Sequence, residues 1–230
     1  SNGDTIHNKE VLNTKQNYYH KPQFSLRDFW TINKRLYISN ILYASIGNGG
    51  GTSISGSAYD NLGQYNLQAV YNGNLGPFSI DPTYSDSEHK SGSYLKSSIN
   101  NHYWYGALST LNYQFTENID LSGGLDFRYY KGEHYREIYD LLGGDYAIVN
   151  DDATQLSPVK RTGDKIGYHN DGLVKWGGIF SQLEYKNPVI STFINLSASN
   201  SGYKRIDYFK KKDLVLEDTT LAQVLGTHPY

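Results

Sequence analysis

Two residue types are missing from this chain of 230 residues, which contains no cysteine and no methionine. Without cysteine the chain can form no disulfide bond, no thiolate nucleophile and no cysteine-ligated zinc site. A primary translation product begins with methionine, so its absence leads us to expect a processed or partial chain. The polar start Ser1-Asn2-Gly3-Asp4 does not resemble a signal peptide.

Long apolar runs are also missing. The mean hydropathy is −0.60 and no apolar run reaches about eighteen residues, which excludes a helical membrane protein. The 21 Lys and Arg residues nearly balance the 23 Asp and Glu residues, so the charge does not support a nucleic-acid partner. Low hydropathy is compatible with a membrane β-barrel, because only alternate residues of its strands face lipid. The 22 tyrosines favour β structure.

The clearest pattern is an alternation of apolar and polar residues between positions 103 and 130. The odd positions before and after a short turn at 116–118 are mostly apolar: Tyr103, Tyr105, Ala107, Ser109, Leu111, Tyr113 and Phe115, then Ile119, Leu121, Gly123, Leu125, Phe127 and Tyr129. Both segments exceed the roughly 9–11 tilted residues that cross a bilayer, whereas globular strands usually have about 5–6. The pattern predicts one long membrane-spanning hairpin.

Two further hairpins follow the same pattern less cleanly. One runs through 23–32 and 36–46, and the other through 172–185 and 189–198. Three polar residues interrupt their apolar parity, so each needs a β-bulge, a shift of register or a place at the rim. These residues are Asp28, Asn40 and Lys175.

The connections between the expected strands are asymmetric. Short turns at 33–35, 116–118 and 186–188 alternate with long segments, an arrangement typical of short periplasmic turns and long extracellular loops. Aromatic residues on the apolar parity lie near both ends of the hairpins, as expected for two interfacial girdles: Trp30, Tyr113, Phe115 and Tyr185 beside the turns, and Tyr103, Tyr105 and Tyr129 at the other ends. The alternative is that these are ordinary strand residues of a soluble sandwich.

We therefore predict an all-β fold, an antiparallel transmembrane β-barrel that is partial, with about six strands in three long hairpins and long extracellular loops. Bacterial barrels begin at about eight strands, and an open edge in lipid leaves backbone groups unsatisfied. One barrel domain, 1–230, is expected to contain strand regions at roughly 20–46, 102–130 and 172–199 and long loops at roughly 47–101, 131–171 and 200–230.

Several stretches resemble the barrel of Bacteroidetes-type TonB-dependent outer-membrane receptors. They are GGLDFRYYKGEHYRE at 123–137, YDLLGG at 139–144, NYYHKPQ at 17–23, WGG at 176–178 and GYKRIDYF at 202–209. The resemblance implies a barrel of about 22 strands, an N-terminal plug domain and a TonB box that couples to the inner-membrane energy complex. The plug and the TonB box have no counterpart in this sequence, which resembles an internal part of the barrel wall.

The resemblance also implies a place in the bacterial outer membrane and a set of partners. These are the rest of the barrel and its plug, the TonB complex, outer-membrane lipid or lipopolysaccharide, and a possible surface lipoprotein. No nucleic-acid partner is expected.

Motifs for covalent or metal chemistry are weak throughout. The seven histidines have no HExxH spacing, and no GxSxG elbow is present, so we expect no enzyme activity, no cofactor and no metal site. Glu133-His134 and the acidic group Asp145, Asp151 and Asp152 are better explained as exposed loop residues than as metal ligands. The glycine run at 47–51 lacks the ending of a phosphate loop and is interpreted as a flexible rim loop.

Two sets of residues are candidates for contact with a solute. The first lies on the parity expected to face the lumen, where bonding to the plug is favoured over direct substrate binding: Asn112, Gln114, Asp120, Asp126 and Arg128. The second lies in the expected loops and suits sugars, peptides or siderophores alike: Tyr135, Arg136, Tyr139 and Tyr146.

Three functions follow. The first is a segment of a TonB-dependent transporter that binds and imports a solute across the outer membrane. The second is an outer-membrane barrel that acts as a binding or scaffold subunit for surface lipoproteins or other partners. The third is a secreted, soluble β-rich binding domain.

Overall fold

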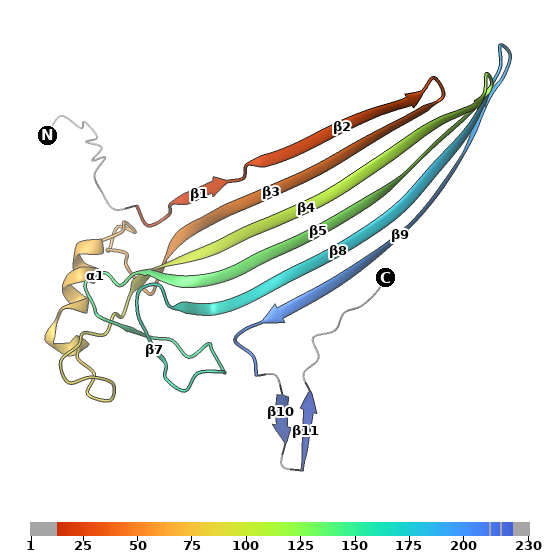
Figure 1. Cartoon of the computed structure of the whole chain (residues 1–230). Coiled ribbons are helices and arrows are strands. Elements are labelled where there is room, and N and C mark those ends of the chain that lie inside the picture. The colour runs from red at the N-terminus through yellow and green to blue at the C-terminus, as the bar shows by residue number, and fades with distance from the viewer. Residues whose placement is uncertain (1–12, 212, 217, 223–230) are drawn as a thin grey trace, which may run out of the picture.

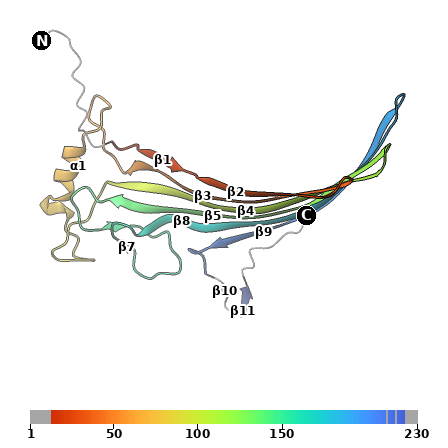
Figure 2. The same cartoon turned by 45° about the horizontal axis from the view of Figure 1, so that its top comes forward.

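A computed structural model describes residues 13–211, 213–216 and 218–222. Its main feature is an antiparallel sheet, which has seven strands within the described residues and the order β1-β3-β4-β5-β8-β9, with β2 also paired to β3. The bounds are β1 Asn17–His20, β2 Gln23–Asn33, β3 Leu36–Ser55, β4 Tyr94–Thr116, β5 Ile119–Asp140, β8 Lys165–Lys186 and β9 Ser191–Asp207. The strands form one curved layer (Figure 2).

The first two strands share one position at the edge of the sheet. β1 pairs with the glycine-rich part of β3 around Gly49, and β2 pairs with the first half of β3. The break between them falls at Lys21-Pro22, where the proline nitrogen cannot donate to a neighbouring strand. The sheet therefore has six positions, as the sequence pattern predicts.

The three expected hairpins are present. Two-residue or four-residue connections at 34–35, 117–118 and 187–190 join β2 to β3, β4 to β5 and β8 to β9. They lie together at one end of the sheet, and the long connections 56–93 and 141–164 lie at the other end (Figure 1). The asymmetry of the connections is thus confirmed.

The strands are longer than expected, which corrects the predicted loop boundaries. Residues 47–55, 94–101, 131–140, 165–171 and 200–207 belong to strands and not to loops. In these parts polar side chains occur on both faces and apolar ones such as Leu95 and Ile138 pack beside the loops, so the regular alternation disappears from the sequence while the backbone pairing continues. The glycine run at 47–51 lies in β3, where all of it is paired with β4 and residues 48–51 are also paired with β1, so it is not a flexible loop. Residues 223–230 of the third expected loop lie outside the described residues.

The long connections contain the remaining elements. They are α1 Leu67–Asn74, the 3-10 helix η1 Pro77–Ser79 and the short strands β6 Ala147–Ile148 and β7 Val159–Lys160. A separate hairpin of β10 Asp213–Leu216 and β11 Thr219–Ala222 follows β9. A small core packs these loops against the strand ends, and its buried members are Ile138, Leu141, Ala147 and Ile166. The core thus lies at the loop end of the molecule. Within the described residues, no helix is long and apolar enough to cross a membrane.

The body of the sheet has two different faces. One face, which we call the apolar face, carries exposed large side chains on every long strand. The register places them in continuous rows: Phe24, Leu26, Trp30, Leu42, Leu125, Phe127, Ile179, Leu183, Ile194 and Leu196. The opposite face, which we call the polar face, mixes polar and aromatic side chains. Within the described residues the sheet is not closed, and β2 and β9 form its two edges.

The three polar residues that interrupt the apolar parity, Asp28, Asn40 and Lys175, fit the sheet without a β-bulge. The only shift between β2 and β3 in the described residues lies between Thr31 and Asn33, away from the aligned pair Asp28 and Asn40. Lys175 is regularly paired with Tyr129. All three residues therefore lie on the apolar face in regular register, and Lys175 lies at its loop-side end.

Candidate functional site

The polar face brings together the five residues that the sequence places on the lumen-facing parity. Asn112 is aligned with Ser122, Gln114 with Asp120, and Gly106 with Arg128 across β4 and β5. Asp126 lies two residues from Arg128 on the same strand and so shares its face. The set is spread along the strands as a row of polar groups and does not converge on one point.

Asp126 and Arg128 form the strongest polar contact on this face. Arg128 Nη2 donates to Asp126 Oδ2 at 2.6 Å, and Arg128 Nε donates to Asp126 Oδ1 at 3.2 Å. The Asp126 side chain is only 12% exposed. The guanidinium also lies 4.8 Å from the centre of the Trp176 ring on β8. This two-pronged bond with a cation–π contact fixes Arg128 over the middle of the face.

Nearer the short turns the polar groups of this face form fewer contacts with one another. Ser122 Oγ donates to Asn112 Oδ1 at 2.7 Å. Gln114 and Asp120 are exposed neighbours across the strands. These groups are available to water or to a second polypeptide.

A cluster of aromatic and histidine side chains lies further towards the loops. His102 Nδ1 lies 2.5 Å from the Tyr130 hydroxyl, and the Trp104 ring meets Tyr130 edge-on at 5.9 Å. Lys21 Nζ lies 5.7 Å from the Trp104 ring, and His134 Nδ1 lies 2.7 Å from Asn100 Oδ1. Trp104 Nε1 is buried with no hydrogen-bond partner among the described residues.

Sequence reasoning did not single out this cluster. The signal was available, because Trp104 and Tyr130 share the even parity of Asn112 and Arg128, and the alternation alone puts them on one face. The candidates predicted from the sequence include only the charged and amide side chains of that parity. Next to the cluster is a hollow of about 580 Å³ whose lining includes Tyr18, Tyr19 and the glycines 49–51.

The four candidates in the expected loops have different surroundings. Tyr135 and Arg136 lie in β5 and not in a loop. The Lys165 ammonium lies 4.5 Å from the Tyr135 ring, and the Arg136 guanidinium 5.1 Å from the Tyr168 ring. Tyr139 also lies in β5 and is 46% exposed, so it can meet a solute.

Tyr146 does not have the exposed position that was expected. Its exposed fraction is 0%, and its hydroxyl has no hydrogen-bond partner among the described residues. The residue belongs to the packing between the loops and contacts the Tyr84 ring edge-on at 6.4 Å. Its position in a long loop suggested exposure, but the loop is folded and this ring fills its interior.

The two long loops form one folded unit at the end of the sheet, which we call the loop module (residues 56–93 and 141–164). Arg161 Nη2 donates to both carboxylate oxygens of Glu88 at 2.8 and 2.9 Å and so ties the loops together. Asn74 at the end of α1 is buried and donates to the carbonyls of Leu141 and Leu142 at 3.1 and 3.0 Å.

The site as a whole offers hydrogen bonds and aromatic surfaces. Among the described residues, no three His, Asp or Glu side chains gather closely enough to hold a metal ion. No protein-family model, curated protein or solved structure matches the chain.

Proposed function

We propose that this chain is a wall segment of a transmembrane β-barrel in the bacterial outer membrane, and that the barrel is a TonB-dependent transporter that binds and imports a solute. The apolar face of the sheet would meet lipid and the polar face would meet the lumen and a plug. The observation that carries the proposal is the exposed apolar face, because a soluble protein would have to cover it.

The extent of this face supports a membrane position. Leu26 and Leu196, near opposite edges of the sheet, are both 69% exposed. Soluble monomers rarely expose one continuous apolar patch of more than a few hundred Å². Here the rows extend over every long strand, and the small buried core lies elsewhere, beside the loops.

The height of the face fits a bilayer. Aromatic residues mark its two ends on β4, with Tyr113 and Phe115 in edge contact near the turns and Tyr105 stacked on Tyr129 at the loop side. A rise of about 3.3 Å per residue puts Phe115 about 33 Å from Tyr105 along the strand. A strand tilt of about 40° reduces this to about 25 Å, the usual height of the lipid-facing band.

Beyond the aromatic row the same face becomes ionic. Lys131 Nζ lies 2.8 Å from Glu133 and 3.1 Å from the buried carboxylate of Asp171. Charged groups of this kind are costly in hydrocarbon but ordinary in the headgroup region or in water. The change of character therefore supports a membrane boundary just above Tyr129.

The open edges support a larger wall. Backbone groups along the free sides of β2 and β9 have no strand partner in the described residues. In lipid such groups must be satisfied by further strands. Supplying those strands would close the sheet, and the polar face with Arg128 and Trp104 would then line the interior.

A second candidate is a barrel that acts as a docking subunit for a surface lipoprotein or another partner. The loop module favours it, because the module is folded and still presents apolar side chains to solvent. Leu62, Phe78 and Leu156 are 85%, 100% and 103% exposed. Large exposed apolar residues on a rigid platform are common at protein interfaces.

Membrane insertion is tested first, on the full-length polypeptide that contains this chain. A barrel resists extraction by alkali, needs detergent to dissolve, and migrates differently on gels before and after heating. We expect all three properties. A protein that stays soluble and monomeric without detergent would contradict the barrel and favour the secreted soluble domain.

The transport function is tested in the bacterium that makes the protein. Deletion of TonB and deletion of the receptor should cause the same loss of growth on one nutrient, because both block the same import step. If the receptor deletion alone causes a defect, and if a surface lipoprotein co-purifies with the barrel, the docking function is favoured instead.

A further inference from the structure

Lys175 occupies a place on the apolar face that the alternation of the sequence does not explain. It is aligned with Tyr129 on one side and Gly202 on the other, so it lies in the aromatic row at the loop-side end. Lys204, aligned with Leu173 on the next strand, is its diagonal neighbour on the same face. The two ammonium groups therefore lie within reach of one ligand.

These two lysines differ from Lys131, a neighbouring lysine on the same side of the sheet. Lys131 is held by two carboxylates. Lys175 and Lys204 are exposed, and neither forms an ion pair with another described residue. They are thus a pair of free cations at the border between the apolar face and the ionic region above it.

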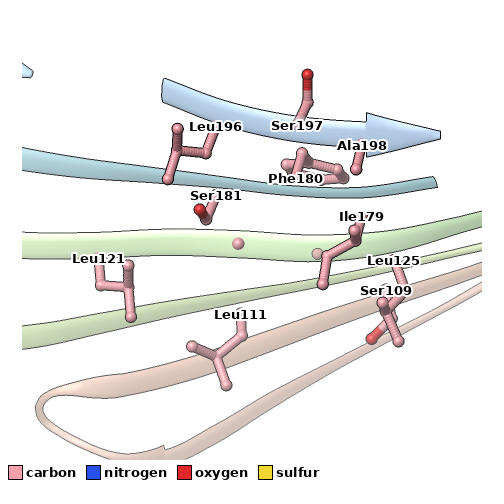
Figure 3. Close-up of a pocket in the computed structure, with 12 residues that line it drawn as sticks. Ser109, Leu111, Leu121, Leu125, Ile179, Phe180, Ser181, Leu196, Ser197 and Ala198 are labelled. Atoms are coloured by element: carbon pink, nitrogen blue, oxygen red, sulfur yellow. The ribbon is translucent and has the colours of Figure 1, made fainter. Parts of the chain in front are cut away.

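Below the lysines the apolar face is hollowed. A cavity of about 590 Å³ lies over β4, β5, β8 and β9, where the small residues Ser109, Gly123 and Ser181 stand between larger ones. Figure 3 shows Leu111, Leu121 and Ile179 pointing to one side of the sheet around this space, whereas Ser197 points to the other side. Its larger lining residues are mostly aliphatic, including Leu125 and Leu196.

The cavity and the lysines are at a distance that suits one lipid molecule. Ser181 lies about 20 Å from Lys175 along β8 at a rise of about 3.3 Å per residue. With a tilt of about 40° the depth is about 15 Å, which is half of the hydrocarbon thickness of a bilayer. A headgroup at Lys175 would therefore place the end of its acyl chain in the cavity.

The surface between the two points leaves room for the chain. Lys175 lines a second hollow of about 480 Å³, whose lining includes Tyr105, Ala107 and Phe127. A side chain added at Gly202 would meet nothing within 4 Å. The hollow and Gly202 thus leave open surface on both sides of Lys175.

We propose that this surface binds one anionic, phosphate-bearing lipid of the leaflet on the loop side, with its phosphate on Lys175 and Lys204 and one acyl chain extending into the cavity over Gly123 and Ser181. Lysine ammonium groups at a membrane surface attract phosphate, and the aliphatic walls exclude water from the chain. This inference rests on the proposed membrane position of the apolar face.

The test uses the full-length protein in detergent and native mass spectrometry. The protein is titrated with anionic dimyristoyl phosphatidylglycerol and with zwitterionic dimyristoyl phosphatidylcholine, which has the same acyl chains. We expect tighter retention of phosphatidylglycerol. The double variant Lys175→Ala/Lys204→Ala should lower that affinity about thirtyfold, because each lysine near a membrane surface contributes about a fivefold factor.

The matched control is Lys34→Ala/Lys186→Ala, which removes two lysines at the short-turn end and should leave the preference unchanged. Ser181→Leu fills the cavity and should weaken the dimyristoyl lipid while sparing dihexanoyl phosphatidylglycerol, whose short chains do not reach the cavity. Heat-dependent gel migration verifies that each variant is folded.

The outcomes separate the two proposals. A folded, membrane-inserted barrel that binds both lipids equally, or whose preference survives the loss of both lysines, overturns the lipid site and leaves the barrel in place. A preference that survives in the lysine control but not in the double variant supports the site. A protein that never enters detergent micelles or bilayers overturns the lipid site together with the proposed function.

Discussion

Asn40 Nδ2 donates to Asp28 Oδ1 at 2.8 Å across β2 and β3, in the middle of the apolar face. Ser109 Oγ on β4 donates to Asn40 Oδ1 at 2.6 Å, and Trp30 Nε1 donates to Asp28 Oδ2 at 3.2 Å. The polar residues that interrupt the apolar pattern are therefore partners of one another. Mutual bonding lowers the cost of placing them beside lipid.

This network predicts that a single substitution lowers the free energy of unfolding more than a double substitution does. Asn40→Leu should lower the free energy of unfolding by about 1–3 kcal/mol, because it leaves the Asp28 carboxylate short of a donor. Asp28→Leu/Asn40→Leu should recover most of that loss, since both bonded groups are replaced by apolar ones. Urea titration of the full-length protein in phospholipid vesicles, followed by tryptophan fluorescence, measures both. Equal losses in the single and the double variant would contradict a lipid-facing position.

The hairpins could be predicted from the sequence because burial or lipid contact on one face produces a period of two. Leu121, Leu125 and Phe127 show that period without interruption. Beyond Tyr129 the signal is lost, because charged side chains then occur on both faces while the strand continues to Asp140. Strand ends therefore could not be predicted, since pairing of the backbone leaves no mark in the side chains.

For the candidate site, the sequence likewise predicts which face a residue lies on but not its contacts with other strands. Parity alone puts Asp126 and Arg128 on one face, and it could have done so for Trp104. The contact between Arg128 and Trp176 depends on the register between β5 and β8, which a 24-residue loop with its own fold connects. The burial of Tyr146 depends on that loop fold too, and no periodic pattern encodes it.

Gly106 gives a test of packing on the polar face. A Cβ at this position would lie within van der Waals overlap of the Tyr43 ring, whose Cζ is the nearest atom. Gly106→Ala should therefore displace Tyr43 and lower the free energy of unfolding by about 1–3 kcal/mol. Gly172→Ala is the matched control, because nothing lies within 4 Å of a Cβ there. The same urea titration compares them, and an equal effect at the two glycines would show that the Tyr43 contact is unimportant.

Asn74 should control the attachment of the loop module. Its amide nitrogen donates to the carbonyls of Ser93, Leu141 and Leu142, and its oxygen accepts from Gly92 N at 3.0 Å. Asn74→Ala removes these four hydrogen bonds, and among the described residues only Leu141 O keeps another close donor, Ser91 Oγ, so we expect a cost of about 2–3 kcal/mol to the local structure.

Hydrogen exchange of the full-length protein should show this loss in residues 56–93 while β4 and β5 stay protected. Asn72→Ala, on the exposed side of α1, is the control and should change little. Loss of protection throughout the sheet in the Asn74 variant would mean that the loops and the strands unfold as one unit.

The ion pair between Lys90 and Asp81 predicts that the loop module loosens in acid. Lys90 Nζ lies 2.7 Å from Asp81 Oδ2. This hydrogen bond from Lys90, helped by bonds from Thr83, lowers the pKa of Asp81 below its usual range. A carboxyl group with a lowered pKa stabilises the folded loop at pH values above its ordinary pKa of about 3.9, and that stabilisation is lost as the pH falls through the lowered value.

Amide exchange at Lys90, whose backbone N–H donates to Ser79 O at 2.8 Å, should therefore accelerate below about pH 4 after correction for the intrinsic rate. The same bond raises the pKa of Lys90, so stability at neutral pH is unaffected by its titration. Asp81→Asn should remove the acid-dependent step, whereas Asp86→Asn, in the same loop, should keep it. If the corrected exchange rate at Lys90 depends on pH in the same way in the unaltered protein and in Asp81→Asn, the pair does not hold the loop.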